Sequence, residues 1–159
     1  MKPRDESAGI KLVATNKKAF HDYFISDKVE AGIVLAGTEV KSLREGGCNL
    51  KDSYARVSPA GNMELLNFHI SPYARGNRFN PDPTRTRRLL LHRREIERLA
   101  SRVKEKGFTL VALRVYFKEG RAKLELGLAK GKDQADRRQD IKERDSNREV
   151  RRMVKLKNR

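Results

Sequence analysis

The sharpest pattern along the chain is an alternation of apolar and polar residues on either side of Glu119-Gly120. A period of two is typical of a strand with one face on a core and the other in water. A glycine-containing turn between two such strands predicts a β-hairpin. The positions expected to face the core are Val111, Leu113, Val115 and Phe117 in the first strand, and Ala122, Leu124, Leu126 and Leu128 in the second.

Shorter segments predict the remaining elements. Segments rich in β-branched, aromatic or alternating apolar residues predict four more strands, at 20–25, 29–35, 50–57 and 63–70. A first short helix is expected over 37–47, with Thr38 as its N-cap and Gly46-Gly47 as its stop. A second helix follows from apolar residues at helical spacing between 96 and 103, and Gly107 ends it.

Together these elements predict one small domain and a tail. About six short strands with helices between them indicate a β-rich, mainly antiparallel barrel of the oligonucleotide-binding (OB) type, with two to three short helices. We expect the barrel to span 11–130, after a flexible N-terminus at 1–10 and before a basic C-terminal tail at 131–159. Strand count alone leaves other small α+β folds open.

The charge of the chain narrows the choice of partner. The chain has a formal net charge of +16 and a pI of about 10.3, which attracts nucleic acid or an anionic membrane. No apolar run approaches the roughly 20 residues that span a bilayer, and no segment has the pattern of a signal-peptide core. We therefore expect a cytoplasmic protein with no membrane partner. Its one cysteine, Cys48, excludes an internal disulfide.

The tail is too charged to fold alone. Residues 130–159 hold 12 Lys or Arg and 6 Asp or Glu, with few apolar side chains to offset the entropy of ordering. Basic residues nevertheless fall on one stripe at helical spacing: Arg144, Arg148, Arg152, Lys155 and Arg159. This pattern predicts a segment that is disordered when free and helical against a polyanion. A solvated tail that only aids solubility is the alternative.

The stretch 71–88 resists assignment to a strand or helix. It contains three of the five prolines, and its only acid is Asp82. Its arginines are Arg75, Arg78, Arg85, Arg87 and Arg88. Guanidinium groups suit phosphate because they can make two parallel hydrogen bonds. The stretch is either a phosphate-binding loop or a flexible surface loop.

Catalytic motifs are missing from the sequence. His21, His69 and His92 have no metal-ligand partner at local spacing, and no P-loop, nucleophile elbow or dinucleotide fingerprint occurs. We expect no enzyme activity, no cofactor and no metal, although an acid–base pair assembled in space stays open. His21 is expected in a strand, where it can stack on a base if it is exposed.

A series of short motifs makes the chain recognisable. In order along residues 11–144 they are NKKA (16–19) with DY (22–23), EAGI (30–33), GTEVKSLR (37–44), DSY (52–54), DPTRTRRLLL (82–91), GLAKGK (127–132), DRR (136–138) and IKER (141–144). Each motif alone is modest, but their order and spacing are specific. The chain closely resembles the SsrA-binding protein (SmpB) family, whose members partner transfer-messenger RNA (tmRNA) in bacteria.

The resemblance implies a binding function and no catalysed reaction. Family members bind the tRNA-like domain of tmRNA and bring it to a 70S ribosome stalled on an mRNA without a usable stop codon. The protein stands in for the missing anticodon stem, and its tail enters the decoding site and the empty mRNA path. We expect a monomer when the protein is free. The rival hypotheses are a permanent ribosomal or ribosome-assembly protein that binds ribosomal RNA, and an RNA-processing enzyme.

The resemblance also implies site residues, position by position. Asn16, Glu30 and Leu90 match positions associated with the tRNA-like RNA, although Leu90 between two leucines can equally be a core residue. The candidates for further RNA contact on the barrel are Lys17, His21, Lys41 and Lys123. The candidates on the ribosome are Lys130, Lys132, Asp136, Arg137 and Arg138, followed by the tail arginines Arg144, Arg148 and Arg152.

One position departs from the family pattern. The family often has Gly-Lys-Lys-x-x-Asp-Lys-Arg, whereas this chain has Gly131-Lys132-Asp133 at the start of the motif. Asp133 in place of lysine lowers the local charge by two. A phosphate contact is therefore not expected at Asp133, and the family assignment is unaffected.

Overall fold

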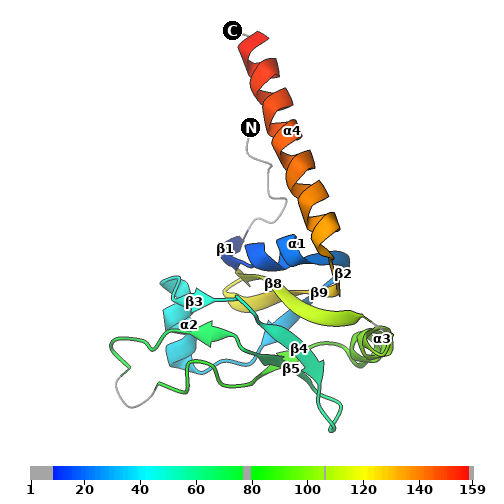
Figure 1. Ribbon diagram of the computed structural model, residues 1–159. Helices are drawn as coiled ribbons and strands as arrows, with labels where there is room; N and C mark the ends of the chain where they lie inside the picture. Colours follow the sequence, from blue (N-terminus) through cyan, green and yellow to red (C-terminus); the bar gives the residue numbers. More distant parts are fainter. Residues whose placement is uncertain (1–8, 77–79, 106, 158–159) are drawn as a thin grey trace.

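Nine strands and four helices make up the part of the chain that the computed structural model describes, residues 9–76, 80–105 and 107–157 (Figure 1). The strands are β1 (Ile10–Thr15), β2 (Tyr23–Ile33), β3 (Cys48–Asn49), β4 (Tyr54–Val57), β5 (Met63–Leu66), β6 (His69–Ile70), β7 (Arg87–Leu90), β8 (Phe108–Lys118) and β9 (Arg121–Gly131). The helices are α1 (Lys17–Asp22), α2 (Gly37–Arg44), α3 (Arg93–Val103) and α4 (Gln134–Lys157).

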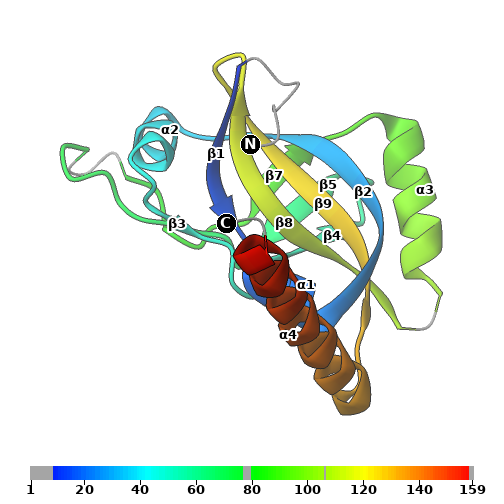
Figure 2. The same ribbon diagram turned by 90° about the horizontal axis from the view of Figure 1, so that it is seen from above.

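Six of the strands close into a ring. The main sheet runs β1-β8-β4-β5-β7-β2-β9, every pairing is antiparallel, and β9 pairs again with β8. One edge of β8 serves two partners, because β4 takes Leu110 and Val111 while β1 takes 114–118. Figure 2 shows the long strands β2, β8 and β9 curving over the shorter ones. The predicted β-rich antiparallel class is confirmed.

The predicted hairpin is present as β8 and β9, but its inward face changes along β8. Glu119 and Gly120 make the turn with φ of 52° and 76°, as a tight hairpin turn between twisted strands requires. A bulge between Ala112 and Arg114 shifts the register. Val115 therefore packs in the main core, whereas Val111 and Leu113 face outward and are covered by α1. The expectation that all four apolar residues of this strand share one face was wrong.

The predicted strand at 20–25 was also wrong, because residues 17–22 form α1. Asn16 is the N-cap of this helix, and its Oδ1 accepts a hydrogen bond from the backbone N–H of Ala19 at 3.1 Å. The chain then enters β2, one strand from Tyr23 to Ile33 whose pairing with β9 shifts register between Ile25 and Asp27. Helix α2 begins at Gly37 as expected, but Ala36 and not Thr38 is at the N-cap position.

The middle of the chain contains more breaks than the pattern predicted. The segment 50–57 is a strand only from Tyr54 onward. The segment 63–70 divides into β5 and β6 at Asn67, whose φ is 59°. The end of the proline-rich stretch, where no strand was expected, forms β7. No helix in the described ranges is both long and apolar enough to cross a membrane.

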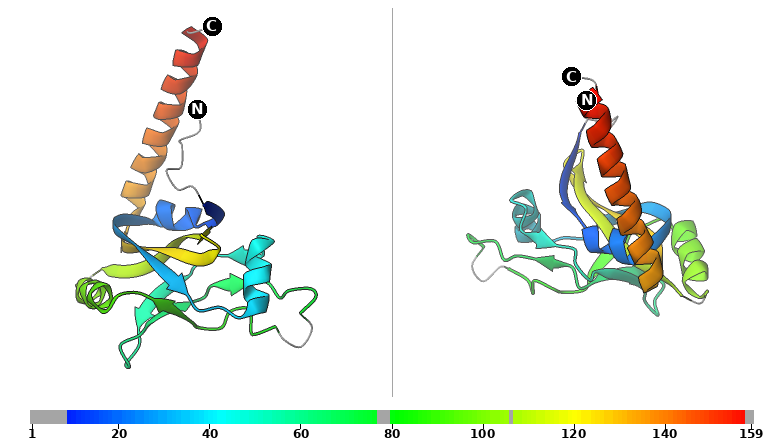
Figure 3. Two further views of the ribbon diagram at one scale, coloured as in Figure 1. Left: turned by 180° about the vertical axis from the view of Figure 1, so that it is seen from behind. Right: turned by 45° about the horizontal axis from the view of Figure 1, so that its top comes forward.

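The tail is a 24-residue helix, α4, that rises from the barrel and points away from it (Figures 1 and 3). The helical form expected on the ribosome is thus the form that the structure contains. Disorder of the free tail stays a prediction, and so does flexibility of the N-terminus, where residues 1–8 lie outside the described part of the chain.

Candidate nucleic-acid interface

Three of the expected RNA-contacting side chains meet around Gly32 on the outer face of the sheet. Gly32 on β2 pairs with Lys123 of β9 on one side and with Leu90 of β7 on the other. Glu30 lies two residues before Gly32, so its side chain projects from the same face of β2. We call Glu30, Gly32, Leu90 and Lys123 the β2 patch.

Leu90 is a surface residue of this patch. Its side chain is 53 % exposed, whereas that of Leu89 is 2 % exposed, as the alternation of a strand requires. A Cβ placed on Gly32 would lie 3.2 Å from the Cβ of Leu90, so the leucine lies close against the glycine backbone. Leu90 therefore offers an exposed apolar surface to a partner, and the alternative of core packing was wrong.

The carboxylate of Glu30 is held in place by neighbours on β8. The Tyr116 hydroxyl donates a hydrogen bond to Oε2 of Glu30, and Nζ of Lys118 lies 3.7 Å from the same oxygen. Burial raises the pKa of Tyr116, and the hydrogen bond to Glu30 raises it further, so the phenol stays a donor. A carboxylate fixed in this way can accept a hydrogen bond from a base amino group at its outward side.

Cations surround the β2 patch along β2 and β8. Lys28 and Arg114 lie 3.8 and 4.0 Å from the carboxylate of Glu125, the residue that pairs with Glu30 across β2 and β9. Both cations also lie over the ring of Phe20, at 5.6 and 5.7 Å from its centroid. Both distances are near the limit for an ion pair and both cations are about half exposed, so these pairs contribute little stability. They place positive charge at the surface beside the patch.

Asn16 does not join the exposed patch. It is buried, and its Nδ2 donates to the carbonyl oxygens of Leu50 at 3.1 Å and Ala112 at 2.9 Å. With Oδ1 capping α1, the side chain holds three parts of the fold together. We therefore expect any effect of Asn16 on RNA binding to act through the position of α1 and not through direct contact.

The other barrel candidates lie on helices. Lys17 is exposed at the first position of α1, which suits a phosphate contact. His21 is in α1 and not in a strand as expected, and its Nδ1 lies 2.8 Å from Oδ1 of Asp22. Lys41 is on α2, 5.7 Å from the ring centroid of Tyr73. Helices α1 and α2 are separate from each other in both views (Figures 1 and 2).

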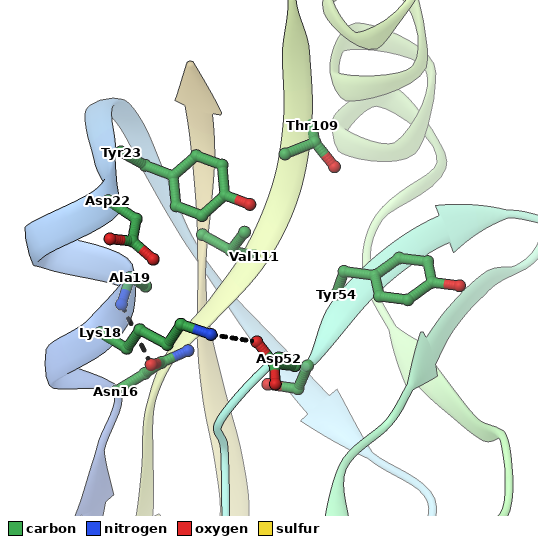
Figure 4. Close-up of a pocket in the computed structure, with 10 residues that line it drawn as sticks. Asn16, Lys18, Ala19, Asp22, Tyr23, Asp52, Tyr54, Thr109 and Val111 are labelled. Atoms are coloured by element: carbon green, nitrogen blue, oxygen red, sulfur yellow. Dashed lines mark hydrogen bonds and ion pairs between the residues drawn. The ribbon is translucent and has the colours of Figure 1, made fainter. Parts of the chain in front are cut away.

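A pocket of about 320 Å³ opens between α1 and the start of β4 (Figure 4). Nζ of Lys18 lies 2.7 Å from Oδ1 of Asp52 at its edge, and this contact raises the pKa of Lys18 and lowers that of Asp52. Tyr23 and Tyr54 line the same pocket. Aromatic rings beside polar groups suit a flat ligand such as a base. Among the described residues, no group of three or more His, Cys, Asp or Glu is placed to hold a metal ion.

Two arginines of the proline-rich stretch bind a carboxylate within the protein, so the whole stretch cannot be a phosphate-binding loop. Nε of Arg85 and Nε of Arg87 donate to the carboxylate of Glu39 at 3.1 and 2.8 Å. Arg87 is fully buried, and it also donates to the carbonyl oxygens of Phe68 and Pro83. These contacts tie α2 to the start of β7. Arg75 and Arg88 are exposed, and Arg78 lies outside the described residues.

The ionisation of Glu39 depends on those arginines. Burial alone would raise the pKa of Glu39, but hydrogen bonds from Arg85, the backbone N–H of Ala36 and Arg87 outweigh burial and lower it. The carboxylate is therefore charged at neutral pH. No local signal in the sequence could indicate this network, because Glu39 is 46 and 48 residues from its two partners.

The expected decoding-site residues lie before and after Lys132, which is buried between β9 and α4. Lys130 is exposed at the end of β9, 5.9 Å from the ring centroid of Phe108. Lys132, in contrast, has a side chain only 7 % exposed. Arg138 is exposed on α4, as are the arginines of the stripe, Arg144, Arg148 and Arg152. The side chains of Asp136 and Arg137 lie outside the described part of the structure.

The known proteins that are similar in sequence to this chain carry matching descriptions. The family model described as SmpB protein matches residues 13–156. An SsrA-binding protein of Geobacillus kaustophilus is 58% identical over 142 residues, which is 89% of this chain and 91% of that protein. One of Bacillus cereus (strain AH820) is 59% identical over 140 residues, 88% of this chain and 90% of that protein.

A solved structure is similar as well. A chain from a structure described as "tmRNA-SmpB: a journey to the center of the bacterial ribosome" is 50% identical to this one, with a TM-score of 0.65. The similarity covers 76% of this chain and 85% of the solved one. Both the sequence and the fold of this protein therefore have relatives described in the same terms.

Proposed function

Because the chain belongs to the SmpB family of SsrA-binding proteins, we propose that it binds tmRNA and delivers it to stalled ribosomes. The match over residues 13–156 carries this proposal, since it includes both the barrel and most of the tail. The protein acts as a monomer in the cytoplasm and catalyses no reaction of its own. Its barrel holds the RNA, and its tail works on the ribosome.

The β2 patch is the part of the barrel that takes the tRNA-like domain. Leu90 contacts an unstacked base, Glu30 accepts a hydrogen bond from a base amino group, and Lys123 pairs with a phosphate. Such a surface reads the shape of an RNA elbow together with a few splayed bases, which is how proteins commonly recognise folded RNA. Lys17 and Lys41 add phosphate contacts outside the patch.

The tail takes the place of mRNA in its channel. Arg144, Arg148 and Arg152 are exposed along α4, and a channel walled by RNA would present phosphates to them. Lys130 and Arg138, at the base of α4, face the decoding site together with Asp136 and Arg137. Away from the ribosome, most of the tail loses its helix because its own apolar surface is too small.

The function is tested by the RNA that accompanies the protein. A tagged protein purified from cells should carry one dominant RNA with a tRNA-like end, found by sequencing the bound RNA. On gradients, the protein should concentrate on stalled ribosomes. Uniform co-sedimentation with all ribosomes and only ribosomal RNA would instead support a permanent ribosomal protein.

We expect Glu30→Ala to weaken binding to the tRNA-like domain by about 1–3 kcal/mol, since a specific polar contact to the RNA is lost. Fluorescence titration at one fixed salt concentration measures the change. Glu97→Ala on α3 is the matched control, because it removes the same charge from an exposed ion pair outside the patch. A purely electrostatic surface predicts tighter binding for both variants, and that result would refute a specific role for Glu30.

Salt dependence provides a second test of the β2 patch. Neutralised phosphates release counterions, so the logarithm of affinity should fall linearly with the logarithm of salt concentration. Lys123→Ala should reduce that slope by about one, the amount expected for a single phosphate contact. Lys104→Ala, an exposed lysine after α3, should leave the slope unchanged. Equal slopes for wild type and Lys123→Ala would remove the lysine from the interface.

A further inference from the structure

The connection between barrel and tail is made by one buried lysine. Lys132 follows the last residue of β9, and its backbone N–H donates to the carbonyl oxygen of Asp22 at 2.8 Å. Its Nζ donates to the carbonyl oxygen of Phe20 at 3.4 Å and to Oδ2 of Asp140 on α4. The same ammonium lies 5.1 Å from the ring centroid of Phe24. Lys132 thus contacts α1, β2 and α4 at once.

These contacts suit a lysine for two physical reasons. The carbonyl oxygens of Phe20 and Asp22 belong to the last turn of α1, where helix carbonyls lack partners and carry partial negative charge. A buried ammonium is costly unless it is paired, and Asp140 supplies the opposite charge. The pair is therefore a built contact between the barrel and the second turn of α4, with more partners than a surface ion pair has.

The rest of α4 has no comparable support. Asp140 is half-buried, whereas the described side chains of α4 on both sides of it, from Arg138 and Gln139 to Lys157, are exposed. Starting a helix is the unfavourable step, because several residues must be fixed before the first hydrogen bonds stabilise them. A contact that holds the second turn against a rigid barrel reduces that cost. The effect should be largest near Asp140 and should fade toward the C-terminus.

We propose that Lys132 and Asp140 form a clamp that starts the tail helix at the barrel and sets the direction in which the helix leaves it. The proposal rests on the tail function proposed above, and it gives both residues a positioning role without contact to RNA. Lys132 was expected at the decoding site from the resemblance, but its burial places it in the clamp.

The clamp is tested in the full-length protein by the Cα chemical shifts of isotopically labelled samples. Wild type should show helical shifts over 134–142 that decline toward the C-terminus. Asp140→Asn should reduce them about twofold or more, because an uncharged amide holds the ammonium less well. Asp140→Glu should restore part of the signal, and Asp145→Asn, an exposed acid on the same helix, should equal wild type. Equal shifts for wild type and Asp140→Asn, or an even helix signal along the whole tail, would overturn the clamp.

A functional measurement separates the clamp from the proposed function. Asp140→Asn should lower ribosome rescue several-fold relative to Asp145→Asn, while tmRNA affinity and the melting temperature of the barrel stay at wild-type values. Failure of wild type to bind tmRNA would refute the proposed function, and the chemical shifts would still decide on the clamp. Rescue by Asp140→Asn at the wild-type rate would show that the clamp does not position the tail.

Discussion

Ending the chain after Lys132 should abolish ribosome rescue while leaving affinity for tmRNA within about 1 kcal/mol of the full-length value, less than a tenfold change in Kd. The β2 patch lies wholly in the barrel, and the described side chains of α4 apart from Asp140 are exposed. The truncation keeps Lys132 because its N–H and Nζ bond to the end of α1. Affinity is measured with the isolated tRNA-like domain, and rescue with ribosomes stalled on an mRNA lacking a stop codon.

A second truncation, after Ser146, provides the matched control. It keeps the clamp and Arg144 but removes Arg148 and Arg152, so it tests whether the basic stripe as a whole is needed. Both truncated proteins should melt with the same barrel transition as the full chain. If the shorter protein loses RNA affinity in proportion to rescue, the tail is part of the RNA-binding surface, and the division of labour proposed here is wrong.

The sequence predicts best what depends on neighbours in the chain. The β8–β9 hairpin follows from alternation and from a turn whose residues adopt positive φ, and both are local properties. The bulge near Leu113 is not local. It depends on α1 covering Leu113 and Val111 from outside and on the close approach of Leu113 to Gly127. For this reason the strand was predictable but its inward face was not.

Helix α1 shows how a local signal can be overlooked. Phe20 and Tyr23 favour strands, and this preference predicts a strand at 20–25. Asn16 is a favourable N-cap and could have indicated a helix starting at Lys17. The two long-range hydrogen bonds of Asn16, to Leu50 and Ala112, had no such signal because they join residues 34 and 96 positions apart.

The candidate site also contains residues that the sequence indicated and residues that only the fold brings together. The resemblance selected Glu30, Leu90 and Lys123, and the pairings of β2 bring all three around Gly32. Tyr116 and Lys118, which hold Glu30, were missed, since only the register between β8, β9 and β2 places them there. The internal contacts of Arg87 and Lys132 were missed because an exposed and a buried cation look alike in a basic sequence.

Glu39→Gln should lower the free energy of unfolding by about 3 kcal/mol, the largest stability effect expected from a single change of charge in this protein. The carboxylate is 3 % exposed and serves Arg85 and Arg87 together. Replacing it with a neutral amide leaves the fully buried guanidinium of Arg87 without its counter-charge. Urea denaturation at neutral pH measures the loss, and the transition should stay cooperative because the barrel core is unchanged.

A matched control and the pH dependence test whether the lost charge of Glu39 causes the loss of stability. Glu64→Gln removes an acid from a partly exposed pair with Arg56 and should cost at most about 1 kcal/mol. Since the pKa of Glu39 in the folded protein lies below its ordinary value of 4.5, the carboxylate stabilises the fold above that value. This contribution should disappear as the pH falls through the lowered pKa. Wild type and Glu39→Gln should therefore converge in stability at acidic pH, and a constant difference down to the lowest pH would exclude ionisation of Glu39 as the cause.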